Sequence, residues 1–228
     1  MKCAIMQPHY LPWPGYFNLM AKVDKFVFLD DVQYSKNSWQ NRNIIINNNK
    51  KIWLTIPLKK SPISTKIKDK IIDDEKNWRK KHIKTLFQCY SKHSYATDLN
   101  ELTAFLQDLK YENLSDYNIK IIIFIANKLS INTEFLSASN FSINKKRTHK
   151  VIEILEKIGA KEYISPIGGK EYLIEDNFQK LSPAKLIIND YKNKNYNQKN
   201  SKDFIPNLSI IDVVANSGWI SSANYVTK

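Results

Sequence analysis

Short runs of apolar residues alternate along the chain with segments whose apolar residues recur at helical spacing. Five runs have the length and the β-branched and aromatic content of buried strands. They are residues 2–6, 26–30, 133–137, 162–165 and 184–189. Helical patterns lie between these strands, as at residues 15–23 and 148–160, and a last helix is expected at 209–218, ending near Gly218 because glycine often caps helices. This alternation predicts an α/β fold with a mainly parallel, Rossmann-like sheet.

Two parts of the chain depart from this alternation. Residues 41–58 contain two β-rich runs on either side of Asn47, Asn48 and Asn49, and asparagine tolerates left-handed turn geometry, so we expect a β-hairpin. Three helical segments then follow within residues 74–130. We therefore expect one domain over residues 1–228, with a helical insertion at about 74–130.

The composition is strongly basic, with a formal net charge of +13. The 32 lysines far outnumber the three arginines and are spread along the chain, while Asn and Ile are also abundant, a bias typical of AT-rich coding sequences. The charge therefore does not by itself indicate a nucleic-acid-binding face, although it attracts small anionic ligands such as nucleotide sugars. Arg42, within "WQNRN", is of interest because a guanidinium group binds phosphate in a planar fork.

The sequence contains no sign of membrane insertion, secretion or metal binding. No apolar run reaches the roughly 18–20 residues that span a bilayer, and the N-terminus lacks the pattern of a signal peptide. The two cysteines, Cys3 and Cys89, form no disulfide framework and no metal motif, so we interpret them as free thiols. We expect a cytoplasmic protein and identify no metal site and no cofactor.

Polar residues follow the first two predicted strands at their carboxyl ends. Gln7 and His9 follow the first strand, and Asp30, Asp31 and Gln33 follow the second. Ligands of open α/β sheets bind beyond the carboxyl ends of the strands, so we expect these residues to converge on one rim. His9, Asp30 and Asp31 are the candidate catalytic residues, since a histidine or carboxylate can act as a general base. The alternatives are that His9 orders its proline-rich loop and that one aspartate caps the strand end.

Glycines and aromatic residues complete the predicted substrate site. Gly15, Gly168 and Gly169 stand after strands at predicted helix starts, where a ligand can approach backbone N–H groups, although turn glycines would look the same. Tyr16 follows Gly15 and offers a flat aromatic face.

The predicted hairpin and the residues just before it add further candidates. Trp39 and Trp53 are candidates for stacking on a sugar or base, or for the core. Arg42 with Asn43 is a candidate grip for phosphate, and the alternative is that Arg42 is a surface charge of the hairpin.

Several blocks of the chain resemble the WbqC-like protein family, in the same order and over nearly the whole length. The blocks are "MKCAIMQPHYLPWPGYF", "DKFVFLDDVQYSKNSWQNRN", "WLTIPLKK", "YISPIGGKEYL" and "LSIIDVV". The resemblance implies a role in bacterial polysaccharide (O-antigen) biosynthesis. Some members are labelled glycine or aminoacyl transferases that act on amino sugars.

The resemblance therefore favours a transferase that N-acylates, or aminoacylates with glycine, a nucleotide-linked amino sugar. An aminoacyl-tRNA and an acyl-CoA are the candidate donors. Two alternatives are a non-catalytic nucleotide-sugar binding or scaffold protein, and an RNA-binding module, to which the positive charge would be relevant.

Overall fold

A five-stranded parallel sheet forms the centre of the molecule, in the order β5-β2-β1-β6-β7. The computed structural model describes residues 1–199 and 201–227. The strands of the sheet are β1 (Lys2–Met6), β2 (Lys25–Phe28), β5 (Glu134–Ser137), β6 (Glu162–Pro166) and β7 (Lys185–Asn189). All four strand pairs are parallel, so the predicted strands and the parallel sheet are confirmed.

The strand order reverses direction next to β1. The chain builds outward from β1 to β2 and β5 on one side, and then returns to place β6 and β7 on the other. Lys2 pairs with Glu162 across this junction, although the two residues are far apart in sequence. This is the doubly wound order, in which the crevice between the two central strands is the preferred ligand site.

Alternation of side chains along the strands assigns each face of the sheet to a separate core. Ala4 and Phe26 point into the larger apolar cluster, whereas Cys3, Ile5 and Val27 point into a second cluster. Successive side chains of a strand point to opposite faces, so a sheet covered on both sides needs apolar residues at nearly every position. This is the pattern of β1 and β2.

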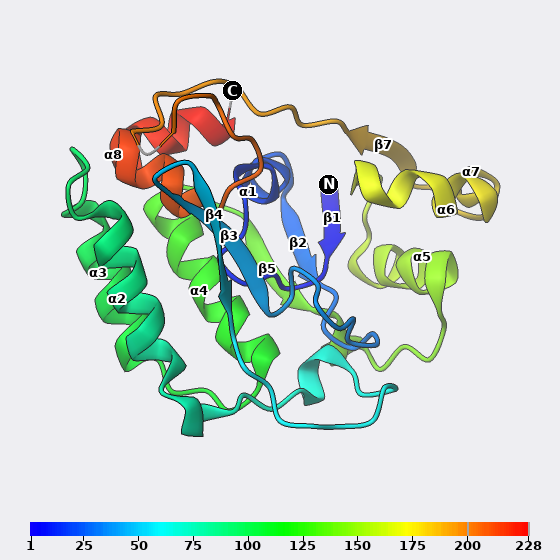
Figure 1. Ribbon diagram of the computed structural model, residues 1–228. Helices are drawn as coiled ribbons and strands as arrows, with labels where there is room; N and C mark the ends of the chain where they lie inside the picture. Colours follow the sequence, from blue (N-terminus) through cyan, green and yellow to red (C-terminus); the bar gives the residue numbers. More distant parts are fainter. Residues whose placement is uncertain (200, 228) are drawn as a thin grey trace.

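Helices cover both faces of the sheet (Figure 1). The helices are α1 (Pro14–Ala21), α2 (Trp78–Tyr90), α3 (Asp98–Asp108), α4 (Leu114–Lys128), α5 (Arg147–Ile158), α6 (Lys170–Glu175), α7 (Phe178–Leu181) and α8 (Ile210–Thr227). Residues of α1, α4 and α8 share the larger cluster with one face, and residues of α5, α6 and α7 share the second cluster with the other. The segment after β7 crosses the top of the molecule in Figure 1 to reach α8.

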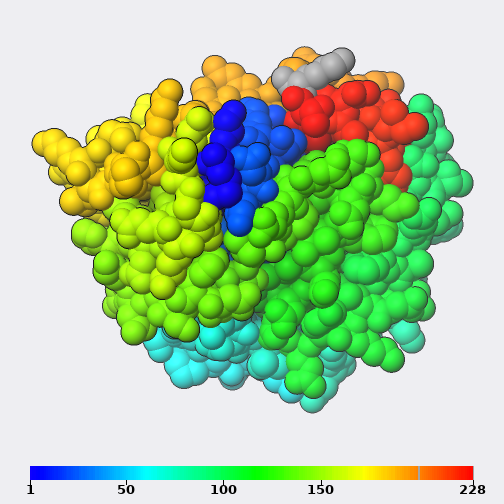
Figure 2. Space-filling view, turned by 180° about the vertical axis from the view of Figure 1, so that it is seen from behind, coloured from blue at the N-terminus to red at the C-terminus, as the bar shows by residue number. Residues whose placement is uncertain are grey.

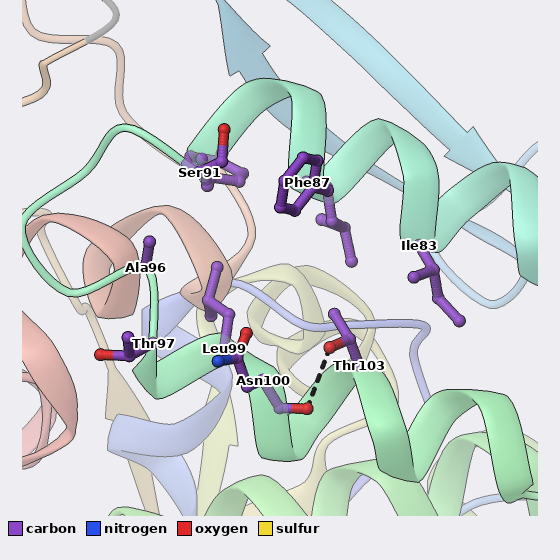
Figure 3. A pocket seen from close by; sticks show the side chains of 10 residues that line it. Ile83, Phe87, Ser91, Ala96, Thr97, Leu99, Asn100 and Thr103 are labelled. Atoms are coloured by element: carbon purple, nitrogen blue, oxygen red, sulfur yellow. Dashed lines mark hydrogen bonds between the residues drawn. The ribbon is translucent and has the colours of Figure 1, made fainter.

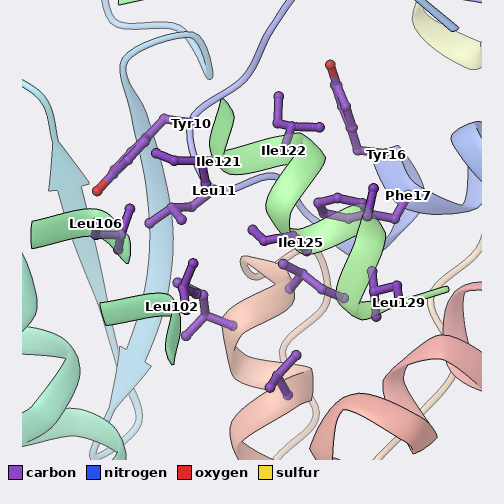
Figure 4. Close-up of a cluster of buried hydrophobic side chains, with 14 of the residues drawn as sticks. Tyr10, Leu11, Tyr16, Phe17, Leu102, Leu106, Ile121, Ile122, Ile125 and Leu129 are labelled. Atoms are coloured by element: carbon purple, nitrogen blue, oxygen red, sulfur yellow. The ribbon is translucent and has the colours of Figure 1, made fainter. Parts of the chain in front are cut away.

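The larger core also holds the loop that follows β1. Figure 4 shows Tyr10 and Leu11 of this loop beside Ile121 of α4 and Leu106 of α3. Tyr10, Leu11 and Ile121 are fully buried. Burial of these side chains fixes the loop to the helical layer, because each large apolar side chain stabilises the fold by about 1.5–3 kcal/mol when removed from water.

The predicted hairpin is confirmed as a separate two-stranded sheet of β3 (Arg42–Asn47) and β4 (Lys50–Thr55). Asn48 and Asn49 form its turn with φ of 46° and 62°. Positive φ at both central residues is the geometry that two-residue hairpin turns require, and asparagine adopts it more readily than most residues.

The predicted helix boundary near Gly218 is a break in α8. Helical geometry is interrupted at Gly218, where φ is 75° and ψ is 168°, and a second helical stretch continues to Thr227. A Cβ atom at Gly218 would lie 2.7 Å from the Tyr95 ring, so the glycine also permits close packing at this break.

In the helical region, the acidic residues before α2 form a separate turn, the 3-10 helix η2 (Asp74–Lys76). The break comes from Asn77, whose φ is 48°.

The amino end of the sheet reaches the rear surface. Figure 2 shows the first residues, in blue, between the C-terminal helix in red and green segments of the middle of the chain. Met1 is accordingly exposed. Cys3 and Cys89 are both buried, and neither is part of a disulfide, as predicted. Within residues 1–199 and 201–227, no helix is long and apolar enough to cross a bilayer.

Candidate functional site

A cavity of about 520 Å³ lies where the strand order reverses, at the carboxyl ends of β1 and β6. Ligand pockets are commonly about 300–1,000 Å³, so the space suits a small molecule such as a sugar ring. The cavity is lined by Ile5, Met6, Gln7, His9, Trp13, Leu29, Trp39, Asn43, Pro166, Ile167, Gly168, Gly169, Tyr172 and Asn207.

The lining of this cavity carries no formal charge at neutral pH. It includes no Asp, Glu, Lys or Arg side chain, and its titratable groups are those of His9 and Tyr172. Burial raises the pKa of Tyr172, which keeps its phenol protonated. Among the lining side chains, His9 therefore supplies the basic nitrogen lone pair and is the candidate for proton transfer.

The loop "QPHYLPWPGY" forms one wall, and the hairpin holds it in place. Asn43 Nδ2 donates hydrogen bonds to the carbonyl oxygens of Tyr10 and Leu11, at 3.0 and 2.8 Å. The Tyr10 N–H donates to the Trp39 carbonyl at 2.9 Å, and Asn118 Nδ2 of α4 donates to the Pro8 carbonyl at 3.1 Å. These bonds satisfy the buried backbone of a segment that prolines exclude from regular structure. Asn43, predicted to bind phosphate, thus holds the loop.

His9 lies half-buried in the cavity wall, next to Tyr16, with ring centroids 5.3 Å apart. Burial lowers the pKa of His9 to about 4, so its imidazole is neutral at pH 7. Among the hydrogen bonds of the described residues, none involves the His9 ring. The ring is therefore a neutral group whose nitrogens are available to a ligand, as the catalytic interpretation requires.

Gln7 is oriented by its neighbour Gln40. Gln40 Nε2 donates to Gln7 Oε1 at 2.7 Å, which leaves the Gln7 amide N–H groups for a ligand in the cavity. The Tyr16 hydroxyl donates to the Gln7 carbonyl at 3.0 Å. Tyr16 is fully buried and does not line the cavity, so it supports the end of β1 from below.

Gly15 also acts from behind the wall. A Cβ atom at this position would lie 2.3 Å from the Trp13 indole, so the ring packs directly over the glycine. Trp13 lines the cavity and Gly15 does not. The absence of a side chain at Gly15 therefore gives the Trp13 indole room to pack against the start of α1.

The opposite wall is the turn after β6. Gly168 faces open space, whereas a Cβ atom at Gly169 would lie 2.5 Å from Ser165 Oγ. Both glycines line the cavity, as does Tyr172 from α6. The structure thus brings together Gln7, His9, Gly168 and Gly169 from two distant parts of the chain.

The structure does not bring the predicted acidic pair to this cavity. Leu29 lines it at the end of β2, and the chain then turns away, with the Asp30 N–H donating to the Phe28 carbonyl at 3.0 Å. Asp30 Oδ1 accepts from the Ser139 N–H at 2.9 Å, and Oδ2 accepts from Ser139 Oγ at 2.6 Å. Asp31 pairs with Lys150 of α5 at 2.5 Å. Both carboxylates have partners within the fold that bind the β2 end to neighbouring segments.

Gln33 is also outside the cavity. It is exposed and forms an isolated antiparallel bridge with Lys66. Because Gln33 follows the turn at the end of β2, it lies away from the rim that holds Gln7 and His9.

The exposed Trp39 and Trp53 form a platform beside the cavity together with the half-buried Arg42. The rings of Trp39 and Trp53 stack with centroids 5.6 Å apart and planes at 29°. The Arg42 guanidinium lies 4.2 Å from the Trp53 ring centroid. Trp39 also lines the cavity, so the platform begins at its edge.

Eight lining residues were not among the predicted site residues: Ile5, Met6, Trp13, Leu29, Pro166, Ile167, Tyr172 and Asn207. Trp13 and Leu29 stand in stretches adjoining predicted site residues, and Tyr172 follows the "IGG" turn, so proximity to those stretches was the available signal. Asn207 comes from the polar segment before α8 and carries no such signal, because only the return of the chain over the sheet places it there.

A second hollow lies between α2 and α3, with a volume of about 250 Å³ (Figure 3). In Figure 3, Ile83 and Phe87 of α2 face Leu99 and Thr103 of α3. This groove is mainly apolar, and it shares no lining residue with the cavity at the strand ends. Within residues 1–199 and 201–227, no three His, Cys, Asp or Glu side chains gather as metal ligands.

Sequence comparisons place these features in a family. A model of the WbqC-like protein family matches residues 7–223, which include the cavity residues from Gln7 to Asn207. The uncharacterized protein Rv1507c of Mycobacterium tuberculosis (strain ATCC 25618 / H37Rv) is 31% identical over 220 residues, or 95% of this chain and 94% of that protein. No solved structure matches the chain.

Proposed function

Because this chain belongs to the WbqC-like protein family, we propose that it is a transferase of bacterial polysaccharide (O-antigen) biosynthesis that acylates the amine of a nucleotide-linked amino sugar. The acyl group is an aminoacyl (glycyl) or simple acyl group. The observation that carries this proposal is the neutral His9 ring in an otherwise uncharged cavity at the reversal of strand order. In this proposal the protein acts in the cytoplasm, where activated sugars and acyl donors are available.

The uncharged lining is suited to the sugar rather than to the phosphates of such a substrate. Gln7 offers amide N–H groups and Tyr172 a protonated phenol, which are suitable partners for sugar hydroxyls. Trp13 and Trp39 offer apolar faces to the ring. A small number of polar groups within a mainly apolar lining is typical of sites that orient a small ligand.

In the proposed reaction one proton is transferred, one bond to the acyl carbon forms and one breaks. The sugar amine attacks the acyl carbon of an ester or thioester donor, forming a C–N bond. His9 accepts the proton that the nitrogen loses and returns it to the departing oxygen or sulfur as the C–O or C–S bond breaks. The amine must arrive in its neutral form, since the ammonium group has no lone pair.

The low pKa of His9 determines which proton it can take. A weak base does not deprotonate a resting amine efficiently, but nitrogen becomes much more acidic once it bonds to the acyl carbon. His9 therefore acts at that stage, and burial ensures that its lone pair is free at neutral pH.

The test combines purified protein with UDP- and dTDP-linked amino sugars and with acetyl-CoA or glycyl-tRNA as donor, followed by mass spectrometry for the acylated sugar. We expect His9→Gln to bind the sugar nucleotide yet to lose about 10²–10⁴-fold in turnover, the range for a general base. His149→Gln is the matched control, because His149 is exposed and outside the cavity. Equal turnover by parent and His9→Gln would refute the assigned role.

A non-catalytic nucleotide-sugar binding protein is the second candidate. The absence of any carboxylate or cation from the cavity lining favours it, since many transferases place such groups beside the reacting atoms. It predicts that nucleotide sugars raise the melting temperature of the protein, because they bind only the folded state, while no donor yields product.

A further inference from the structure

Two tryptophans on the hairpin side of the cavity are unusually open to solvent. Trp39 is 42% exposed and Trp53 is 44% exposed, whereas Trp78 is 3% exposed. Neither Trp39 nor Trp53 belongs to either apolar cluster or packs against one. Their contribution to the core is therefore small, and a large exposed aromatic surface beside a cavity is typical of ligand recognition.

The hairpin register places Arg42 against one of these rings. Arg42 pairs with Thr55 and Trp53 pairs with Ile44, so Arg42 and Trp53 are diagonal neighbours on one face of the hairpin. The guanidinium lies 4.2 Å from the Trp53 centroid, a cation–π arrangement. This contact orients the cation while leaving its charge uncompensated.

Arg42 differs from the two other arginines in its ion pairs. Arg79 pairs with Asp74, and Arg147 pairs with Glu175 and Asp176. Over residues 1–199 and 201–227, Arg42 has no carboxylate within ion-pair distance, and its buried Nε has no hydrogen-bond partner.

We propose that Trp39, Trp53 and Arg42 form a nucleotide subsite, in which the tryptophan rings stack on the nucleobase and Arg42 binds the phosphate. This inference rests on the proposed function and specifies how the substrate lies: the sugar enters the cavity and the nucleotide remains on the platform outside. The cavity lining offers no cation for a diphosphate, so the phosphate charge must be met outside it. A neutral sugar on the platform would make no use of the unpaired guanidinium.

Trp39 links the two parts of this site, because it both lines the cavity and stacks on Trp53. Stacking on tryptophan tolerates any base, since every base has a π-face. The subsite therefore selects for a nucleoside phosphate as a class, and the choice among bases requires other contacts.

The test uses nucleotides without a sugar, so that it does not depend on the transfer reaction. UDP, dTDP, GDP and ADP are titrated against the full chain by isothermal calorimetry, with quenching of tryptophan fluorescence as a second signal. We expect at least one nucleotide to bind, and Trp53→Ala to weaken that binding about tenfold or more, as loss of a base stack does. We expect Arg42→Gln to weaken binding of the nucleoside diphosphate more than binding of the matching nucleoside.

Phe87→Ala is the matched control, since Phe87 is 70% exposed but lies in the groove between α2 and α3. It should bind nucleotides as the parent does, and unfolding curves establish that each variant is folded. Nucleotide affinities that are equal in the parent, Trp53→Ala and Arg42→Gln would overturn the subsite. The subsite would also be overturned if the protein bound a single-stranded oligonucleotide but none of the mononucleotides. If a free amino sugar is acylated while no nucleotide binds, the subsite fails and the acyl transfer survives.

Discussion

Lys150 Nζ lies 2.5 Å from Asp31 Oδ2, and both side chains are only 7% exposed. The pair joins α5 to the segment that follows β2. Lys150 also donates to the Ile143 carbonyl at 3.2 Å, while Asp31 Oδ1 has no hydrogen-bond partner among the described residues. The carboxylate therefore depends on one cation for its compensation.

Removal of that cation should be strongly destabilising. We expect Lys150→Met to lower the free energy of unfolding by about 3–5 kcal/mol, because it leaves a buried charge without a partner. The double variant Asp31→Leu/Lys150→Met should lose less stability than Lys150→Met alone, since neither buried charge then remains. Urea unfolding of the parent and variants measures both effects. A Lys150→Met protein as stable as the parent would contradict the structural role of the pair.

The ring of His9 should titrate far below an ordinary histidine. Burial lowers its pKa to about 4, against about 6.5 for an exposed histidine. NMR of the histidine ring signals between pH 3.5 and 8 measures the midpoint directly, with His9→Gln identifying the signal. A His9 midpoint between 6 and 7 would show that the ring is solvated.

Stability should fall as the solution becomes acidic, in part because of His82. This ring is buried, its Nδ1 lies 2.9 Å from the Tyr10 hydroxyl, and burial lowers its pKa to about 4. An unfolded histidine titrates near 6.5, so between pH 6.5 and 4 the unfolded chain binds more protons. The contribution of the neutral His82 ring to the free energy of unfolding is therefore complete above pH 6.5 and is lost as the pH falls towards 4.

The measurement is the free energy of unfolding of the parent and of His82→Gln between pH 4.5 and 7.5. The parent should lose up to about 1.4 kcal/mol more per pH unit than the variant below pH 6.5. Parallel curves for parent and His82→Gln would mean that His82 is protonated without cost in the folded state.

Two glycines of the predicted site should respond differently to alanine. A Cβ atom at Gly15 would meet the Trp13 indole at 2.3 Å, whereas one at Gly168 would meet nothing within 4 Å. We expect Gly15→Ala to cost about 1–3 kcal/mol of stability by displacing the indole, and Gly168→Ala to stay within about 0.5 kcal/mol. Thermal and urea unfolding compare the two. Equal stabilities would show that the indole moves aside freely.

The sequence by itself determined most of the elements and the parallel class of the sheet. Apolar runs at residues 2–6 and 162–165 read as strands buried on both faces, and such strands occur in parallel sheets flanked by helices. The hairpin followed from Asn48 and Asn49, because turn chemistry is local. The cavity position followed as well, since parallel strands present their carboxyl ends at one edge, and Gln7 and Gly168 stand just beyond two of them.

Only the tertiary structure decided which side chains enter the cavity. The chain turns after Leu29, so this residue lines the cavity and Asp30 bonds to Ser139 instead. Sequence proximity to a strand end fixes the position of a side chain within a few residues, but its direction depends on partners that arrive from distant segments. Asn207 shows the converse, because it reaches the cavity only after the chain crosses the sheet. The low pKa of His9 likewise comes from the protein packed around it, and no local pattern encodes that burial.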